Sequence, residues 1–153
     1  MTDERLYAKD WLNRMYHTVR YIESLACKRQ NVLASMSGIG KYDADFIPGG
    51  NGENSTETKN LEYSLLSEQI EKEQRKLTKE DIRTLNVILQ IDNSPDGQMM
   101  KSVLIDRYLS RMSWNKIAEK QGYSQRRLLQ LHERALDYAY PYIPKGEVLK
   151  DFT

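Results

Sequence analysis

Side chains rich in hydrogen-bond donors gather in one stretch near the C-terminal end of this 153-residue chain. From Ser113 to Ala139, capping, turn and apolar residues follow one another as expected for two short helices joined by a tight turn. Ser113 and Ser124 are each placed to accept a hydrogen bond from an unpaired main-chain N–H at the start of a helix. Gly122 lies where the chain must leave the first helix with a positive φ, which glycine adopts without steric cost. We therefore predict a helix-turn-helix.

The second helix of this motif has an apolar face and a donor-rich face. The apolar residues recur at i, i+3, i+7 and i+11, flanked by Leu136, and are Leu128, Leu131, Ala135 and Ala139. The opposite face offers Gln125, Arg126 and Gln130, which have the length and the donors to reach base edges in a major groove. Further cations around them are placed to meet phosphates, namely Lys116, Lys120, Arg127 and Arg134.

The same stretch resembles the fourth region of the principal bacterial sigma factors, whose helix-turn-helix contacts the −35 promoter element. The matching residues are Ser113, Ile117-Ala118, Gly122, Ser124, Arg127, Gln130 and Arg134-Ala135-Leu136. The resemblance implies that Gln125, Arg126 and Gln130 contact bases. It also implies that Arg107, Ser113 and Arg134 hold the DNA backbone.

The chain departs from sigma factors in two ways. Where those proteins usually carry arginine, glutamate and arginine, it has Gln125, Arg126 and Leu129, so no −35 sequence preference is implied. It also has nothing similar to the sigma region that melts the −10 element. The resemblance therefore covers a DNA-reading head and does not make the chain a sigma factor.

The layout of the whole chain resembles the small phage-encoded regulators of the ArpU/RinA type, late-transcription activators of phages that infect Gram-positive bacteria. A long helix, a linker and further helices precede a sigma-like motif that ends Leu131-His-Glu-Arg-Ala-Leu136, and the C-terminal half carries most of the likeness. This implies a sequence-specific regulator that binds double-stranded DNA and controls phage or prophage genes. Two alternatives remain: an adaptor that binds RNA polymerase or another regulator without reading DNA, and a packaging protein similar to a phage small terminase subunit.

Apolar periodicity predicts an all-α fold whose first part is a helical hairpin over residues 1–77. Residues 3–34 contain no glycine or proline and are predicted to form one long helix. A second helix over 57–77, with Leu61 and Leu65 in its apolar face, is expected to fold back on the first across a glycine-rich linker at 35–56. The apolar seam of the first helix requires a partner, so we expect the hairpin to dimerise or to dock on another protein.

The second part is predicted to be a compact four-helix head over residues 78–144, followed by a loose tail at 145–153. Thr78 starts a capping-box pattern, which predicts that a new helix begins there. Charge agrees with a DNA-binding role for this end of the chain. Residues 101–153 hold 10 Lys and Arg against 6 Asp and Glu, whereas residues 1–100 hold 13 against 16.

Composition argues against several other classes of protein. Cys27 is the only cysteine, which excludes an intramolecular disulfide and favours a reducing cytoplasm, here that of a bacterial host. No apolar run approaches the length of a membrane span, and the first residues do not resemble a signal peptide. His17, His132 and Cys27 have no metal-binding spacing, and no catalytic arrangement is recognisable. We expect no enzyme activity, no cofactor and no metal.

Overall fold

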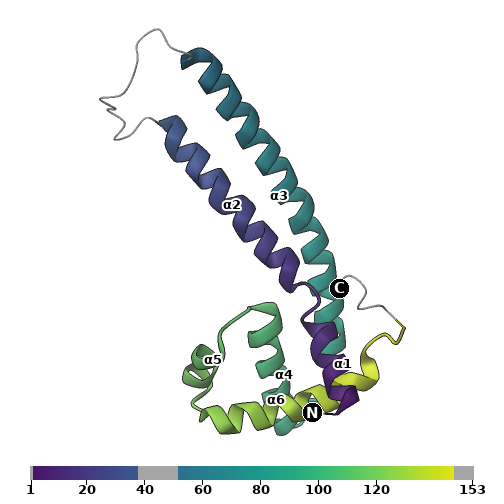
Figure 1. The fold of residues 1–153 in the computed structure, drawn as a ribbon. Coiled ribbons are helices and arrows are strands. Elements are labelled where there is room, and N and C mark those ends of the chain that lie inside the picture. The colour runs from purple at the N-terminus through teal and green to yellow at the C-terminus, as the bar shows by residue number, and fades with distance from the viewer. Residues whose placement is uncertain (1, 38–51, 147–153) are drawn as a thin grey trace. The chain divides into compact units, whose positions relative to one another are not determined.

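The computed structural model describes residues 2–37 and 52–146, and within them all regular structure is helical. The expected all-α class is confirmed for this part of the chain. Two compact units form, one from Tyr16–Thr78 and one from Met1–Met15 together with Lys79–Thr153. We call them the hairpin and the head. In chain order the elements are α1 (Asp3–Leu12), α2 (Tyr16–Ser37), α3 (Gly52–Leu89), α4 (Pro95–Leu104), the π-helical turn η1 (Ile105–Leu109), α5 (Trp114–Gln121), α6 (Gln125–Ala139) and the 3-10 turn η2 (Tyr140–Tyr142) (Figure 1).

The prediction of one helix over residues 3–34 is wrong, because the chain breaks at residues 13–15. The cause lies in the tertiary contacts of Arg14. Its guanidinium donates to the Trp11 carbonyl at 3.0 Å and lies over the Trp11 ring at 3.8 Å. It also donates to the hydroxyl of Thr84 at 2.9 Å and to the carbonyl of Glu80 at 2.9 Å. These bonds hold α1 in the head, although it was assigned to the hairpin.

The prediction that a helix begins at Thr78 is also wrong, since α3 runs through this residue without a break. A capping residue starts a helix only where the chain before it leaves helical geometry. No glycine or proline lies between Leu61 and Leu89 to force such a departure. The main-chain N–H groups that Thr78 would have capped are instead bonded within α3.

The head is built where α4 packs against α6, with α1 and η2 also packed on α6 and α5 packed on both α6 and η1. Its larger apolar cluster joins α1, the end of α3, α4 and α6 around Trp11, Ile88, Met100, Leu104 and Leu136. A smaller cluster lies under α5 and comprises Val103, Ile117, Ala118, Leu128 and Leu131. Met100, Val103, Leu104 and Tyr108 are all buried in these clusters.

The turn before α4 is closed by hydrogen bonds of its own residues. The Ser94 hydroxyl accepts from the main-chain N–H of Gly97 at 3.0 Å, which caps the helix, and Pro95 occupies the first turn, where its missing N–H costs no hydrogen bond. The Asp92 carboxylate accepts from the hydroxyl and from the main-chain N–H of Ser94, and these bonds lower the pKa of Asp92 below its usual value. The turn thereby places Gly97 directly against the main chain of Asp92.

In the hairpin, α2 and the first part of α3 lie side by side and antiparallel, as predicted (Figure 1). Val32 and Ile70 are its buried apolar side chains. Polar contacts add to the seam, including an ion pair of Lys28 with Glu62 at 3.7 Å. Leu61, expected in the apolar face toward α2, is instead exposed, and so is Leu65. The expected linker bounds of 35–56 are too wide, because α2 extends to Ser37 and α3 begins at Gly52, and residues 38–51 lie outside the described residues.

Candidate nucleic-acid interface

The helix-turn-helix predicted at 113–139 is confirmed as a structure, with both caps in the expected register. The Ser113 hydroxyl accepts from the main-chain N–H of Lys116 at 3.2 Å, and the Ser124 hydroxyl accepts from that of Arg127 at 3.1 Å. Gly122 ends α5 with φ 73°, the left-handed conformation for which glycine was expected. The chain thus enters α6 at a fixed angle to α5.

The apolar face of α6 is buried as the periodicity predicted. Its inward residues are Leu128, Leu131, Ala135, Leu136 and Ala139. On α5, Ile117 and Ala118 are buried as well. Because this face is filled by core packing, only the opposite face of α6 is left to meet a ligand.

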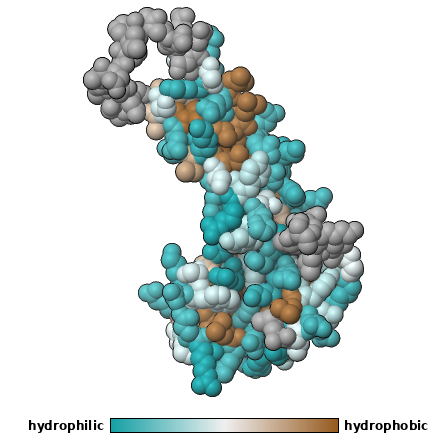
Figure 2. Space-filling view, viewed as in Figure 1, coloured by the Kyte–Doolittle hydropathy of each residue, from teal (hydrophilic) through white to brown (hydrophobic). Residues whose placement is uncertain are grey.

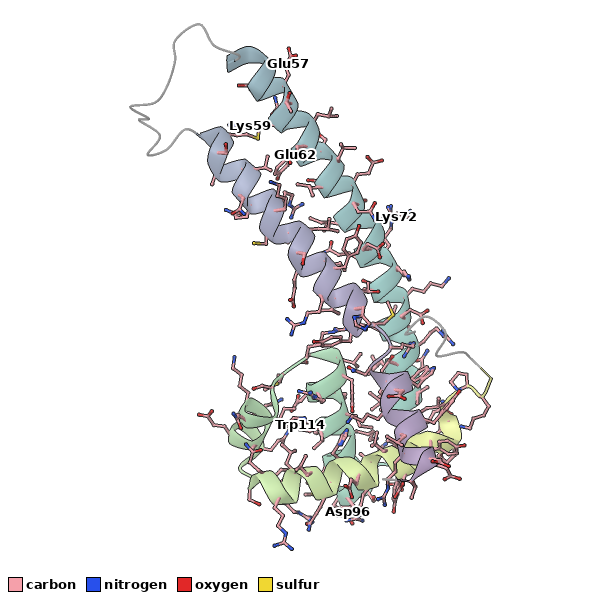
Figure 3. All side chains as sticks on the ribbon, viewed as in Figure 1. Glu57, Lys59, Glu62, Lys72, Asp96 and Trp114 are labelled. Carbon is pink, nitrogen blue, oxygen red and sulfur yellow. The ribbon has the colours of Figure 1, made fainter. Side chains whose placement is uncertain are left out.

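A column of aromatic and polar rings supports the motif from within the head. The Trp114 ring packs edge-on against His132 with 4.7 Å between centroids, and Trp114 lies inside the angle formed by α4, α5 and α6 (Figure 3). The Tyr108 hydroxyl lies 2.7 Å from Nε2 of His132. Burial lowers the pKa of His132 to about 4, helped by the nearby cations of Lys9 and Arg107, and burial raises the pKa of Tyr108. The tyrosine is therefore the donor and the neutral imidazole the acceptor, which places the ring proton on Nδ1.

Arg107, predicted to contact phosphate, has an internal role in the structure. Its guanidinium donates to the Met112 carbonyl at 3.1 Å and lies 4.6 Å from the centre of the Trp114 ring. It therefore holds the segment between η1 and the start of α5. A phosphate contact by Arg107 stays a prediction.

Two further predicted phosphate contacts are paired with carboxylates. Lys120 donates to Asp106 at 2.8 Å, and Gln121 donates to the other oxygen of the same carboxylate at 3.0 Å. Asp106 is buried, so these bonds anchor the last turn of α5 on η1. Arg134 lies 3.6 Å from Asp96 of α4 in a more exposed pair. Asp106 lies between Ile105 and Arg107 in the sequence, and this local context did not indicate that its carboxylate would be buried.

The remaining predicted contacts form an exposed, donor-rich surface. Their side chains make no ion pair or hydrogen bond with another residue of the described segments, and they are Lys116, Arg126, Arg127 and Gln130. Gln125 is exposed too, and its amide nitrogen donates to Oδ1 of Asn115. That bond uses one N–H of Gln125 and leaves the second N–H and the carbonyl oxygen available. We call these five residues of α5 and α6 the donor face.

A contact that no sequence pattern indicated pairs the acidic residues beside the donor face with one arginine and so offsets part of their charge. Arg5 of α1 binds both oxygens of Asp137, at 2.8 and 2.7 Å, and lies 3.4 Å from Glu133. These carboxylates point outward from α6, where they would repel phosphates. The same bonds raise the pKa of Arg5, foremost the hydrogen bond to Asp137. Since α1 was assigned to the hairpin, no sequence pattern could place Arg5 here.

The described part of the chain has neither a metal-binding cluster nor a helix able to span a membrane. No group of His, Cys, Asp and Glu side chains suited to a metal ion forms within it. Among the helices of residues 2–37 and 52–146, none is both long and apolar enough to cross a membrane. Comparisons with models of known protein families, with curated proteins and with solved structures each found no match for this chain.

Proposed function

We propose that this chain is a sequence-specific, double-stranded-DNA-binding transcription regulator of phage or prophage genes that acts as a homodimer in the bacterial host cytoplasm. The donor face is the observation that carries the proposal. Four of its side chains are exposed on the two helices of a capped helix-turn-helix and have no ion-pair or hydrogen-bond partner among the described residues. Several long cationic and amide side chains on this surface therefore have no partner in the described part of the protein. Such a surface is suited to DNA, whose phosphates are negatively charged and whose base edges form hydrogen bonds.

In this proposal the N-terminal half of α6 enters the major groove. Arg126 and Gln130 are one helical turn apart on the same face, so both can reach base edges at once. An arginine suits the O6 and N7 acceptors of guanine, and a glutamine suits the N6 donor and N7 acceptor of adenine. Lys116 of α5 and Arg127 of α6 would meet phosphates, which fix the register without reading sequence.

The first prediction tests this assignment of base contacts. The double substitution Arg126→Ala, Gln130→Ala should abolish enrichment of any one site when duplexes are selected from random DNA at near-physiological salt. Each residue should contribute about 1–3 kcal/mol at the specific site, since each makes a bidentate contact. Both side chains are exposed, so the fold should be unaffected.

The matched control is Lys116→Ala, Arg127→Ala. It should weaken binding to specific and random DNA alike and flatten the dependence of affinity on salt, because phosphate contacts release counterions whatever the sequence. If the first double variant retained the enriched site, Arg126 and Gln130 would not be the base-reading residues. If the unsubstituted protein enriched no site, the proposal as a whole would be rejected.

A second prediction concerns Arg5. Replacing it with alanine should weaken binding to all DNA sequences severalfold at low salt, because Glu133 and Asp137 would then face the phosphates unpaired. The loss should shrink as salt is raised. Adding Glu133→Gln and Asp137→Asn to Arg5→Ala should restore affinity, measured by fluorescence anisotropy with a labelled duplex. No recovery in the triple variant would mean that Arg5 acts through the fold of α1 and not through charge.

One observation favours a second candidate, the adaptor that binds RNA polymerase or another regulator through the same head. Leu129 lies on the outward side of α6 with 48% of its surface exposed, at the position where sigma factors usually carry an arginine. An apolar side chain there suits a protein surface better than a phosphate. Under this candidate, Leu129→Ser would abolish polymerase binding, and loss of Arg126 and Gln130 would leave DNA affinity unchanged.

A further inference from the structure

The outward face of α3 in the hairpin carries two exposed leucines. Leu61 and Leu65 expose 61% and 58% of their surface, although they lie in the middle of a well-formed helix. They are one turn apart, and Ile70, which packs toward α2, lies on the opposite side of α3. Figure 2 shows apolar residues at the surface of the hairpin. No described residue of the hairpin covers these two side chains.

Charged residues extend the same stripe along α3. Glu57 precedes the leucines by one turn, and Glu68 and Lys72 follow them at helical spacing. All three are exposed and form no ion pair with another described residue. Figure 3 shows Glu57 and Lys72 on the side of α3 that faces away from α2. The stripe therefore begins with the acidic Glu57, continues with the two leucines and ends with Glu68 followed by the basic Lys72.

We propose that this stripe is the dimer interface and that a second copy of the chain packs its own α3 against it, antiparallel and related by a two-fold axis. This specifies the dimer that the proposed function calls for. Placing Glu57 opposite Lys72 of the partner subunit also places Leu61 opposite the partner's Glu68 and brings Leu65 beside the partner's Leu65. The four leucines then lie in one row, with Glu68 of each subunit beside Leu61 of the other and an ion pair of Glu57 with Lys72 beyond each end.

The charge order selects the antiparallel arrangement. In a parallel pair each residue meets its own copy, so Glu57 would face a glutamate and Lys72 a lysine, which is unfavourable. In the antiparallel pair, Glu57 of each subunit faces Lys72 of the partner subunit, so opposite charges meet at both ends. A two-fold interface must be complementary to itself, and a stripe with opposite charges at its two ends meets that condition.

The rest of the hairpin offers no equal surface on α3. Beside the stripe, toward α2, this helix presents polar residues such as Glu62 and Gln69. Its inward position Ile70 is already buried against α2. Within the hairpin part of α3, the exposed large apolar side chains are therefore Leu61 and Leu65, whereas Ile82 and Leu89 are exposed in the part of α3 that belongs to the head.

The third prediction reverses the charges at the two ends of the stripe. Glu57→Lys and Lys72→Glu should each convert a dimer to a monomer at protein concentrations where the unsubstituted full chain is dimeric, measured by light scattering after size exclusion. Combining the two should restore the dimer, because every ion pair is then re-formed with its signs exchanged. A monomeric unsubstituted chain, or single variants that remain fully dimeric, would overturn the proposal.

Cysteine cross-linking gives a second readout that does not depend on charge. In a background where the exposed Cys27 is replaced by serine, Leu65→Cys should form an intermolecular disulfide under mild oxidation, because this position lies next to the two-fold axis. Lys72→Cys should not, because in the antiparallel pair its own copy lies far along the helix. Cross-linking of Lys72→Cys as fast as Leu65→Cys would indicate a parallel pair and overturn the arrangement. Neither assay contains DNA, so failure here leaves DNA binding by the head to be judged separately.

Discussion

The head is expected to lose about 3 kcal/mol of stability as pH falls from 7 to 4 because of His132 alone. In the unfolded chain this imidazole takes up a proton near pH 6.5, whereas in the folded head its pKa is lowered to about 4 by burial. Between these values the unfolded chain binds more protons than the folded one, so acid favours unfolding. The contribution is fully present above pH 6.5 and is lost progressively toward pH 4. Protonation of Nε2 would also remove the acceptor of the Tyr108 hydroxyl.

Urea unfolding followed by tryptophan fluorescence would measure this effect. Both tryptophans of the chain, Trp11 and Trp114, belong to the head, so the signal reports this unit and not the hairpin. His132→Gln keeps a neutral hydrogen-bonding group and should lower stability at pH 7, because it loses the ring packing against Trp114. Its stability should then fall less steeply with acid than that of the unsubstituted chain. Equal slopes in the two proteins would show that His132 is not the group that titrates.

Gly97→Ala is expected to destabilise the head by roughly 2–3 kcal/mol, even though alanine favours helices. A Cβ on Gly97 would overlap the main-chain carbonyl of Asp92 and its carboxylate. The carbonyl cannot swing away as a flexible side chain would, so the turn capped by Ser94 must open or α4 must shift. Since α4 packs against α6, a shift of α4 would also displace α6, which carries most of the donor face.

Gly122→Ala is the matched comparison for this substitution. Nothing lies within 4 Å of a Cβ at Gly122, and its cost should be only that of a positive φ, about 1 kcal/mol. Unfolding free energies from the same fluorescence assay would compare the two. If Gly97→Ala lowered the unfolding free energy no more than Gly122→Ala, the turn before α4 would be able to rearrange at little cost in free energy.

The helix-turn-helix could be predicted from the amino-acid sequence because its determinants are local. Ser113, Gly122 and Ser124 act on main-chain groups within four residues of themselves. The buried stripe of α6 follows from helical periodicity alone. The exposed residues Arg126 and Gln130 were located by the same periodicity, since the face opposite a buried stripe meets solvent.

The contacts of Arg5 and Arg14 join residues that lie far apart in the sequence. They depend on tertiary packing, so sequence patterns could not predict them. Arg14 ends α1 by binding residues 66 and 70 positions away, and Arg5 pairs with acids 128 and 132 positions away. An exposed arginine and one that bridges two helices have the same local sequence signature. For the same reason, periodicity located an apolar face on α3 but placed Leu61 and Leu65 on the wrong side of the hairpin. Helical spacing defines which residues share a face, whereas the partner that covers this face is set by how the helices pack.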